Sequence, residues 1–164
     1  MVVAVMSDLH DNVVAWGLIA KWLVDHQVAV LINCGDTSSP AMLERMAKDY
    51  YGTIHTVFGN VADRALESEV VEHLPNVTHH GDRGEVALAG LRLGFTHKPD
   101  GAEIMARSGE YDVVCHGHTH LKRWERIGDC RVLNPGTAGG MFQYPSIATL
   151  DLPKRQHEFI DLKL

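Results

Sequence analysis

The stretch Val2-Val3-Ala4-Val5-Met6-Ser7-Asp8-Leu9-His10 decides the fold, because it joins a continuous apolar run to a polar end. Five apolar residues without alternation are typical of a strand that is buried on both faces, as in a parallel sheet. The run has no basic flank and no cleavage site, so we interpret it as a strand and not as a signal peptide. Asp8 and His10 therefore lie at the end of the first predicted strand.

The next segments alternate between strands and helices. Apolar residues recur at helical spacing in two of them, and short apolar runs form the others. This β-α-β-α-β order predicts parallel strands that are joined by right-handed crossovers. The predicted elements are a helix over 15–25, a strand over 28–33, a helix over 41–49 that begins at Pro40 with Ser39 as its N-cap, and a strand over 53–58.

The second half of the chain changes character. Two apolar runs flank Ala89-Gly90, which is typical of a hairpin turn, and three late runs indicate a strand meander with Pro153-Lys154 in its last turn. We therefore expect mixed sheets with helices outside, parallel early and antiparallel late. The predicted strands are 85–89, 91–96, 112–115, 131–133, 146–151 and 156–162, with a helix over 102–108.

Size and composition limit the classes of function. The chain has 164 residues, 45% of them hydrophobic and 22% charged, which predicts a single domain over 1–164. Its net charge of −6 argues against extended nucleic acid as a partner. No apolar run reaches the ~20 residues that cross a bilayer, so we expect no membrane partner. Three cysteines without a CxxC pair predict reduced thiols and a cytoplasmic location.

Five of the predicted strands end in a side chain that can bind a metal ion. Ligands of open α/β sheets bind beyond the carboxyl ends of the strands, so these ends are expected to converge. Asp8 and His10 are two residues apart, as are His118 and His120, and in extended backbone that spacing puts both side chains on one face. The candidate ligands are Asp8, His10, Asp36, Asn60, His97, His118 and His120, and Gly35, Gly59 and Gly117 precede three of them where tight turns are needed.

Each motif alone has a simpler explanation. An Asp at a strand end is commonly a cap or a turn former, and Gly-Asp and Gly-Asn pairs mark ordinary turns. The three histidines in 116–120 are harder to explain by packing, and the full combination at strand ends predicts a metal site. Carboxylates, imidazoles and one amide suit Mn, Fe, Zn, Ni or Co better than Mg or Ca. Such ions would also supply the positive charge that an acidic chain needs to handle phosphate.

In this order the motifs resemble the calcineurin-like metallophosphoesterase superfamily, and within it the small single-domain phosphodiesterases of bacteria and archaea. The resemblance runs from Asp8-Leu9-His10 through Gly35-Asp36, Gly59-Asn60 and 117–120 to the turn Asn134-Pro135-Gly136-Thr137. It implies an α/β fold, a four-layer α/β/β/α sandwich with two mixed β-sheets. It also implies two divalent metal ions, with Mn favoured over Ni, Fe, Zn or Co.

The resemblance further implies a role for each candidate. Two ions ~3.5–4 Å apart lower the pKa of a shared water, so that hydroxide can attack phosphorus without a covalent phospho-enzyme. The implied catalytic residues are Asp36, Asn60 and His97, and Asn60 would help to stabilise charge on the phosphoryl oxygens. The implied ligands are Asp8, His10 and His120 for the first ion, Asn60, His97 and His118 for the second, and Asp36 as the bridge between them.

The sequence departs from the family pattern after the Gly-Asn pair. Many members carry a His there as a general acid, whereas this chain has Val61, and the nearest acid is Asp63. Without a proton donor a poor alkoxide leaves slowly, so we expect phosphodiesters or activated aryl esters to be preferred over alkyl monoesters. The substrate would be a small-molecule or nucleotide-like phosphate ester.

Two other functions stay open. A eukaryotic trafficking subunit resembles the same small branch and serves chiefly as a protein-binding scaffold, and a phosphomonoesterase would share the fold. The complete set of seven ligand positions favours the enzyme over the scaffold. The sequence does not decide whether the chain is a homodimer, or whether Asp63, His116, Lys98 or Arg64 take part in the reaction.

Overall fold

The computed structural model describes residues 1–141 and 143–163. The elements follow in the order β1 (Val2–Met6), α1 (Val13–Asp25), β2 (Val30–Asn33), α2 (Pro40–Asp49), β3 (Thr53–Thr56), α3 (Arg64–Val71), β4 (Val77–His79), β5 (Arg83–Leu88), β6 (Leu91–Thr96), α4 (Pro99–Arg107), β7 (Val113–Cys115), β8 (Arg123–Ile127), β9 (Cys130–Asn134), β10 (Ser146–Asp151) and β11 (Gln156–Asp161).

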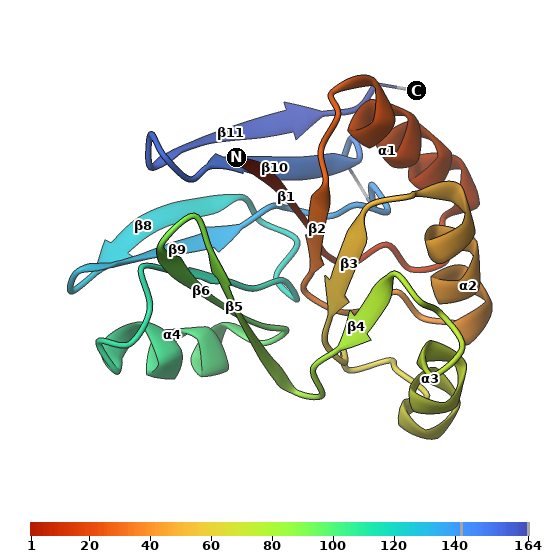
Figure 1. Ribbon diagram of the computed structural model, residues 1–164, viewed down its shortest axis with the longest axis horizontal. Helices are drawn as coiled ribbons and strands as arrows, with labels where there is room; N and C mark the ends of the chain where they lie inside the picture. The colour runs from red at the N-terminus through yellow and green to blue at the C-terminus, as the bar shows by residue number, and fades with distance from the viewer. Residues whose placement is uncertain (142, 164) are drawn as a thin grey trace.

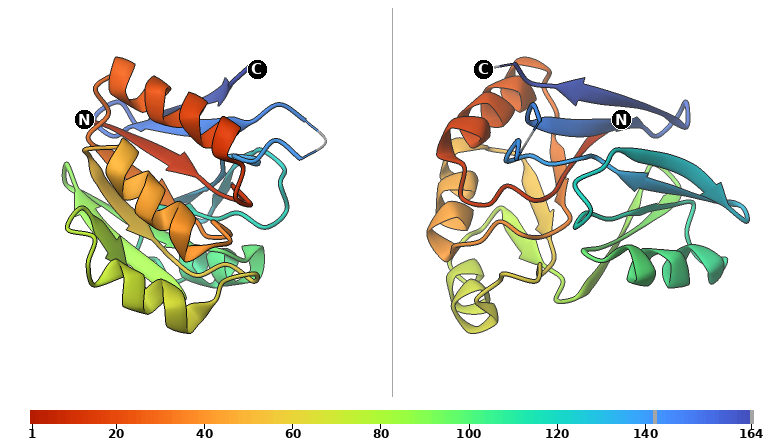
Figure 2. Two further views of the ribbon diagram at one scale, coloured as in Figure 1. Left: turned by 90° about the vertical axis from the view of Figure 1, so that its right-hand side faces the viewer. Right: turned by 180° about the vertical axis from the view of Figure 1, so that it is seen from behind.

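The strands form two sheets that pack face to face between helices. One sheet has the order β11-β10-β1-β2-β3-β4 and the other β5-β6-β7-β9-β8. Helices α1, α2 and α3 cover the outer face of the first sheet, and α4 covers the outer face of the second (Figures 1 and 2). Each sheet contains parallel and antiparallel pairs. The predicted α/β/β/α sandwich with two mixed sheets is therefore confirmed.

Strand β1 shows how one apolar run serves two layers of the core. Val3 and Val5 belong to the cluster between the sheets, whereas Ala4 and Met6 belong to the cluster beneath the helices. Successive side chains of a strand point to opposite faces, so a strand buried on both sides must be apolar throughout. A third cluster joins Ala102 and neighbouring residues of α4 to the second sheet.

The predicted meander at the end of the chain is wrong. Strand β9 lies in the second sheet and runs parallel to β7, whereas β10 crosses to the first sheet and pairs antiparallel with β1. Of the three strands predicted to form the meander, only β10 and β11 pair with each other as a hairpin. Residues 85–133 also include parallel pairs, β6 with β7 and β7 with β9, so the late part of the chain is mixed and not simply antiparallel. Non-local strand pairing of this kind leaves no mark on the local sequence pattern.

Some helix and strand boundaries differ from the prediction for identifiable reasons. Helix α1 begins earlier than predicted because the Asn12 side chain caps it by accepting from the Ala15 amide, and α2 begins at Pro40 with Ser39 as its cap, as predicted. Helix α4 begins at Pro99, three residues before the predicted start. Helix α3 and the strands β4 and β8 were not predicted. The side chains of α3 and β8 are mostly exposed or half-buried, so neither shows a clear apolar face.

Candidate metal centre

The candidate ligands lie in loops that directly follow strands of both sheets. Asp8 and His10 follow β1, Asp36 follows β2, and the other four follow β3, β6 and β7. Backbone hydrogen bonds join the first two loops, from the Asp8 amide to the Gly35 carbonyl and from the His10 amide to the Asp36 carbonyl. The loop after β7 is joined to the first by the His118 amide, which donates to Oδ2 of Asp8 at 2.9 Å. The predicted convergence of strand ends is thus present in the structure.

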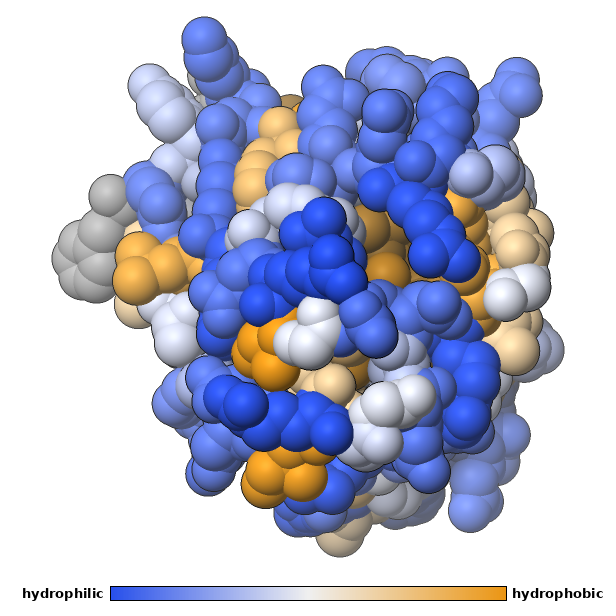
Figure 3. All heavy atoms as spheres, turned by 90° about the vertical axis from the view of Figure 1, so that its left-hand side faces the viewer, coloured by the Kyte–Doolittle hydropathy of each residue, from blue (hydrophilic) through white to orange (hydrophobic). Residues whose placement is uncertain are grey.

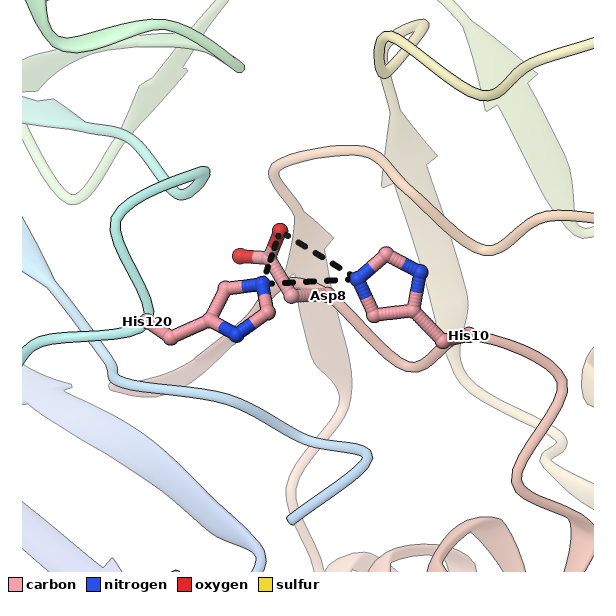
Figure 4. Close-up of side chains that lie close together, drawn as sticks. All are labelled: Asp8, His10 and His120. Carbon is pink, nitrogen blue, oxygen red and sulfur yellow. Dashed lines mark hydrogen bonds and ion pairs between the residues drawn. The ribbon is translucent and has the colours of Figure 1, made fainter. Parts of the chain in front are cut away.

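Asp8, His10 and His120 form the first cluster (Figure 4). Oδ1 of Asp8 lies 3.3 Å from Nε2 of His120 and 3.9 Å from Nε2 of His10. The two Nε2 atoms are 3.4 Å apart. Oδ1 of Asp8 is buried and has no hydrogen-bond partner among the described residues. A buried carboxylate oxygen without a donor is costly, and a cation shared with the two imidazoles would satisfy it.

Asp36, Asn60, His97 and His118 form the second cluster. Nε2 of His97 lies 3.2 Å from Oδ2 of Asp36 and 2.9 Å from Oδ1 of Asn60. The same Asn60 oxygen lies 2.8 Å from Nδ1 of His118. Asp8, Asp36 and His97 each offer one ligand atom within 4.8 Å of the others, so the two clusters adjoin at the aspartates. Asp8 belongs to both groups, and Asp36 belongs to the group with His97.

The tautomer of His97 is fixed by its surroundings. Its Nδ1 lies 2.8 Å from the Cys34 carbonyl, which can only accept, so Nδ1 carries a hydrogen. The lone pair of a neutral His97 at Nε2 then faces two oxygens, a repulsive arrangement unless a proton or a cation lies between them. An imidazole oriented by a backbone carbonyl in this way is the usual form of a metal-binding histidine. The residues present therefore fit a divalent cation.

The pKa shifts of His97 and Asp36 follow from their contact. Burial lowers the pKa of His97, but its hydrogen bond with Asp36 and the charge of that carboxylate outweigh burial and leave the pKa above its ordinary value. Burial raises the pKa of Asp36, but hydrogen bonds from His97 and from the Val61 amide leave it below its ordinary value. Both shifts show that this position favours positive charge beside an ionised carboxylate.

The backbone at the site is not extended, which corrects one step of the sequence argument. Asp8, His10, Asp36, His118 and His120 have φ of 59°, 50°, 54°, 69° and 59°, in the left-handed region. The spacing of two residues therefore does not place side chains on one strand face, and His118 and His120 belong to different clusters. Left-handed backbone costs ~1–2 kcal/mol per non-glycine residue, and such strain gathers at functional sites.

Two glycines let other loops approach the carboxylates. A Cβ at Gly59 would lie 1.8 Å from Oδ1 of Asp36, and a Cβ at Gly117 would lie 1.8 Å from the Ser7 hydroxyl oxygen and 2.6 Å from Oδ2 of Asp8. No side chain fits at either position without moving a carboxylate of the site. Close approach explains these glycines, since neither has a positive φ.

The loop that carries His118 and His120 is held by residues outside the ligand set. Nδ2 of Asn134 donates to the Gly117 carbonyl at 2.9 Å and to the Thr119 hydroxyl at 3.0 Å. The Thr137 hydroxyl donates to the Asp8 carbonyl at 3.1 Å. Both residues belong to the Asn-Pro-Gly-Thr turn that supported the resemblance. The sequence revealed this motif but not its contacts.

His116 packs behind the same loop and belongs to neither cluster. Its Nδ1 lies 3.0 Å from the Gly117 carbonyl, and its Nε2 lies 3.3 Å from Nη1 of Arg123. Burial, together with the charge of Arg123, lowers the pKa of His116 below its ordinary value. His116 therefore supports the backbone of the loop.

The other residues left open by the sequence have different surroundings. The Asp63 side chain accepts from the Leu66 amide and caps α3. The Val61 side chain is 47% exposed, while its amide donates to Oδ1 of Asp36 at 3.0 Å. Arg64 and Lys98 line a cavity beside the second cluster.

Comparison with a family model and with known proteins identifies the family of the chain. The model of the calcineurin-like phosphoesterase superfamily domain matches residues 1–155, so the chain belongs to that superfamily. The predicted family and the predicted class of enzyme, a metallophosphoesterase, are confirmed, and membership implies divalent metal ions. In the part of the chain that the structure describes, none of the helices is long and apolar enough to cross a membrane.

The relatives include proteins with and without a named activity. Phosphodiesterase MJ0936 of Methanocaldococcus jannaschii is 29% identical over 166 residues, covering 99% of this chain and 100% of the relative. The solved structure of an archaeal phosphodiesterase has a TM-score of 0.90 at 29% identity, with 99% and 100% covered. Vps29 of Entamoeba histolytica, complexed with Zn²⁺, shares the fold at a TM-score of 0.67 and 16% identity, with 99% and 100% covered.

Proposed function

We propose that the chain is a metal-dependent phosphodiesterase whose seven candidate ligands hold two divalent cations, manganese before Ni, Fe, Zn or Co. Asp8, His10 and His120 would hold the first and Asn60, His97 and His118 the second, with Asp36 as the bridge. The observation that carries the proposal is the buried Oδ1 of Asp8, which faces two imidazole nitrogens and has no hydrogen-bond donor among the described residues. The full-length likeness to an archaeal phosphodiesterase supports the same activity.

Bound at this centre, two cations would lower the pKa of a water and neutralise charge on the phosphoryl group. The residues of the chain would position the metal ligands and polarise the phosphoryl group. The carbonyl of Cys34 orients His97, and the amide of Val61 orients the Asp36 carboxylate. The Asn60 side chain is exposed beside the cavity, where its amide can reach a phosphoryl oxygen.

The residues after Asn60 are the basis for the proposed preference for diesters. Val61 offers no proton at the position where many relatives carry a histidine, and Asp63 caps a helix. A leaving alkoxide would then depart without a general acid, which favours diesters with good leaving groups over alkyl monoesters.

We further propose that residues 1–164 form a single domain that works in the cytoplasm, where its three buried cysteines stay reduced.

The test combines metal analysis with kinetics. Purified protein should retain about two equivalents of Mn²⁺ and hydrolyse bis(p-nitrophenyl) phosphate with a higher kcat/KM than p-nitrophenyl phosphate or an alkyl monoester. Asp36→Asn should abolish turnover, because an amide cannot bridge two cations as an anion does. Val61→His should raise activity toward monoesters. Full activity in Asp36→Asn would refute the bridging role, and an intact fold that binds metal without hydrolysing any ester would favour the scaffold.

A further inference from the structure

A cavity of about 470 Å³ adjoins the proposed second metal site, since Asn60 and His97 both line it. Its other walls come from the loop that enters α3, the residues between β4 and β5, and the first turn of α4. The volume lies in the range of sites that bind small organic ligands. A substrate whose phosphate reaches Asn60 and His97 would therefore extend its organic part into this cavity.

Three cationic side chains line this cavity, and one of them is already neutralised. Nη2 of Arg64 lies 2.7 Å from each carboxylate oxygen of Asp82, and the guanidinium lies 4.2 Å from the centre of the Phe58 ring. A guanidinium held on both sides keeps one position, and the carboxylate offsets its charge. Arg64 therefore forms a fixed wall of the cavity.

Arg83 and Lys98 are the two cations left to bind a ligand. Both are exposed, and neither makes an ion pair with any residue of the described part of the chain. The chain as a whole carries a net charge of −6, so two such cations beside the metal centre run against its general charge. Two cationic side chains that lack an ion-pair partner and line one cavity can recognise phosphate or carboxylate groups.

The first turn of α4 brings the amide groups of a helix start to the cavity, together with the carboxylate of Asp100. Lys98 is the N-cap of this helix but makes no side-chain capping hydrogen bond. The amide groups at the start of a helix carry partial positive charge that favours an anion nearby. The acidic residue of this turn, Asp100, directs its carboxylate onto the Gly101 amide. Phe58 and Ile104, whose side chain is 60% exposed, provide apolar wall for the organic part of a ligand.

A second cavity, of about 380 Å³, shows what such a surface looks like when its charges are balanced. It lies among the ends of β7, β8, β9 and β10, away from the candidate ligands. There Arg126 pairs with Asp129, and Arg155 lies 3.8 Å from Asp112. Figure 3 views the molecule from the side of these strand ends, and its apolar residues lie in separate groups between polar ones. The cavity beside the metal centre differs because it combines Arg83 and Lys98 with the reacting groups.

We propose that the cavity beside Asn60 and His97 binds a second phosphate on the organic part of the substrate, with Arg83 and Lys98 as the groups that recognise it. The preferred substrate is then a phosphodiester that carries a further phosphate in addition to the one that is cleaved. This inference rests on the proposed phosphodiesterase function and names its substrate class. Arg83 and Lys98 are specificity-determining residues and take no part in bond cleavage.

Equilibrium binding tests the proposal without turnover. We expect the Mn²⁺-loaded protein to bind thymidine 3′,5′-bisphosphate about tenfold more tightly than thymidine 5′-monophosphate in low salt, equivalent to about 1.4 kcal/mol. The double variant R83Q/K98M should bind the two within about twofold, because the second phosphate has lost its partners. The double variant K48M/R107Q removes the same charge from positions at the ends of α2 and α4 and should keep the preference.

The possible results separate this inference from the function on which it rests. Equal binding of the two nucleotides by the native protein would overturn it, as would a preference that survives R83Q/K98M or is lost equally in K48M/R107Q. Hydrolysis of the p-nitrophenyl ester of thymidine 5′-phosphate, with and without a 3′-phosphate, is measured in parallel. Absence of both hydrolyses would refute the phosphodiesterase while the binding data still decide the role of the cavity.

Discussion

The Asp36–His97 pair and the His10–His120 pair stand side by side in the metal centre but differ in burial. The side chains of His97 and Asp36 are 4% and 3% exposed, whereas those of His10 and His120 are 23% and 26% exposed. His97 is oriented by a backbone carbonyl at 2.8 Å, whereas Nδ1 of His10 lies 3.4 Å from the Ser38 hydroxyl. One pair is buried, and the other is partly exposed to solvent.

This difference shows how the imidazoles of one centre can contribute unequally to metal binding. A buried imidazole that has lost its conformational freedom on folding binds an ion without a further entropic cost, whereas a half-exposed one must still be ordered. We therefore expect His97 to contribute more to metal affinity than His10 or His120 does.

The largest effect is expected for His97→Ala. The change leaves the ionised Asp36 buried without its partner, and it removes a metal ligand that folding has already ordered. We expect kcat/KM for bis(p-nitrophenyl) phosphate to fall on the order of 10³-fold, with about one Mn²⁺ left per chain. Metal analysis after gel filtration gives the stoichiometry. A variant that keeps two ions and its activity would show that the burial of an imidazole does not decide its contribution to metal binding.

A smaller and recoverable loss is expected for His120→Ala. The truncated site stays open to solvent, so a water can replace the imidazole. We expect kcat/KM to fall about 10²-fold at low Mn²⁺ and to recover in part as Mn²⁺ is raised. Activity titrated against Mn²⁺ measures this recovery. If His120→Ala were as insensitive to added Mn²⁺ as His97→Ala, the two pairs would be equivalent and the comparison would fail.

The smallest effect is expected for His116→Gln, which lies outside both pairs. Loss of the imidazole removes its contacts with the Gly117 carbonyl and with Arg123, so the loop that carries His118 and His120 is held less firmly. We expect Mn²⁺ affinity to fall about tenfold. His26→Gln is the matched control, because His26 lies at the exposed end of α1 and stacks on Trp22. Equal effects of the two changes on metal binding would exclude a supporting role for His116.

The sequence predicted the parts of the fold that depend on local pattern. The apolar run of β1 predicted a strand buried on both faces, and the Ser39-Pro40 pair predicted the start of α2. Helix α3 was not predicted because the one residue it buries is Glu67. Oε2 of Glu67 lies 3.5 Å from Nε2 of His79. A buried carboxylate with a distant partner has no signature in a search for apolar stripes.

The candidate ligands were found for a reason that is only partly right. Their position at strand ends brought them together, as the general rule for α/β sheets states. A spacing of two residues places side chains on one face only in extended backbone. The backbone is left-handed at Asp8, His10, His118 and His120. These conformations are imposed by hydrogen bonds between distant loops, such as that from the His118 amide to Asp8, and so could not be predicted from neighbouring residues.

The crossing of β10 to the first sheet has a consequence for how the protein is made. Strand β1, which carries the first aspartate, is flanked on one side by β2 and on the other by β10, whose residues are translated more than a hundred positions later. The Gly139 amide, which precedes β10 in the chain, also donates a hydrogen bond to the Asp8 carbonyl. During synthesis β1 must therefore wait with one open edge until β10 has emerged, and the backbone around Asp8 is completed only then.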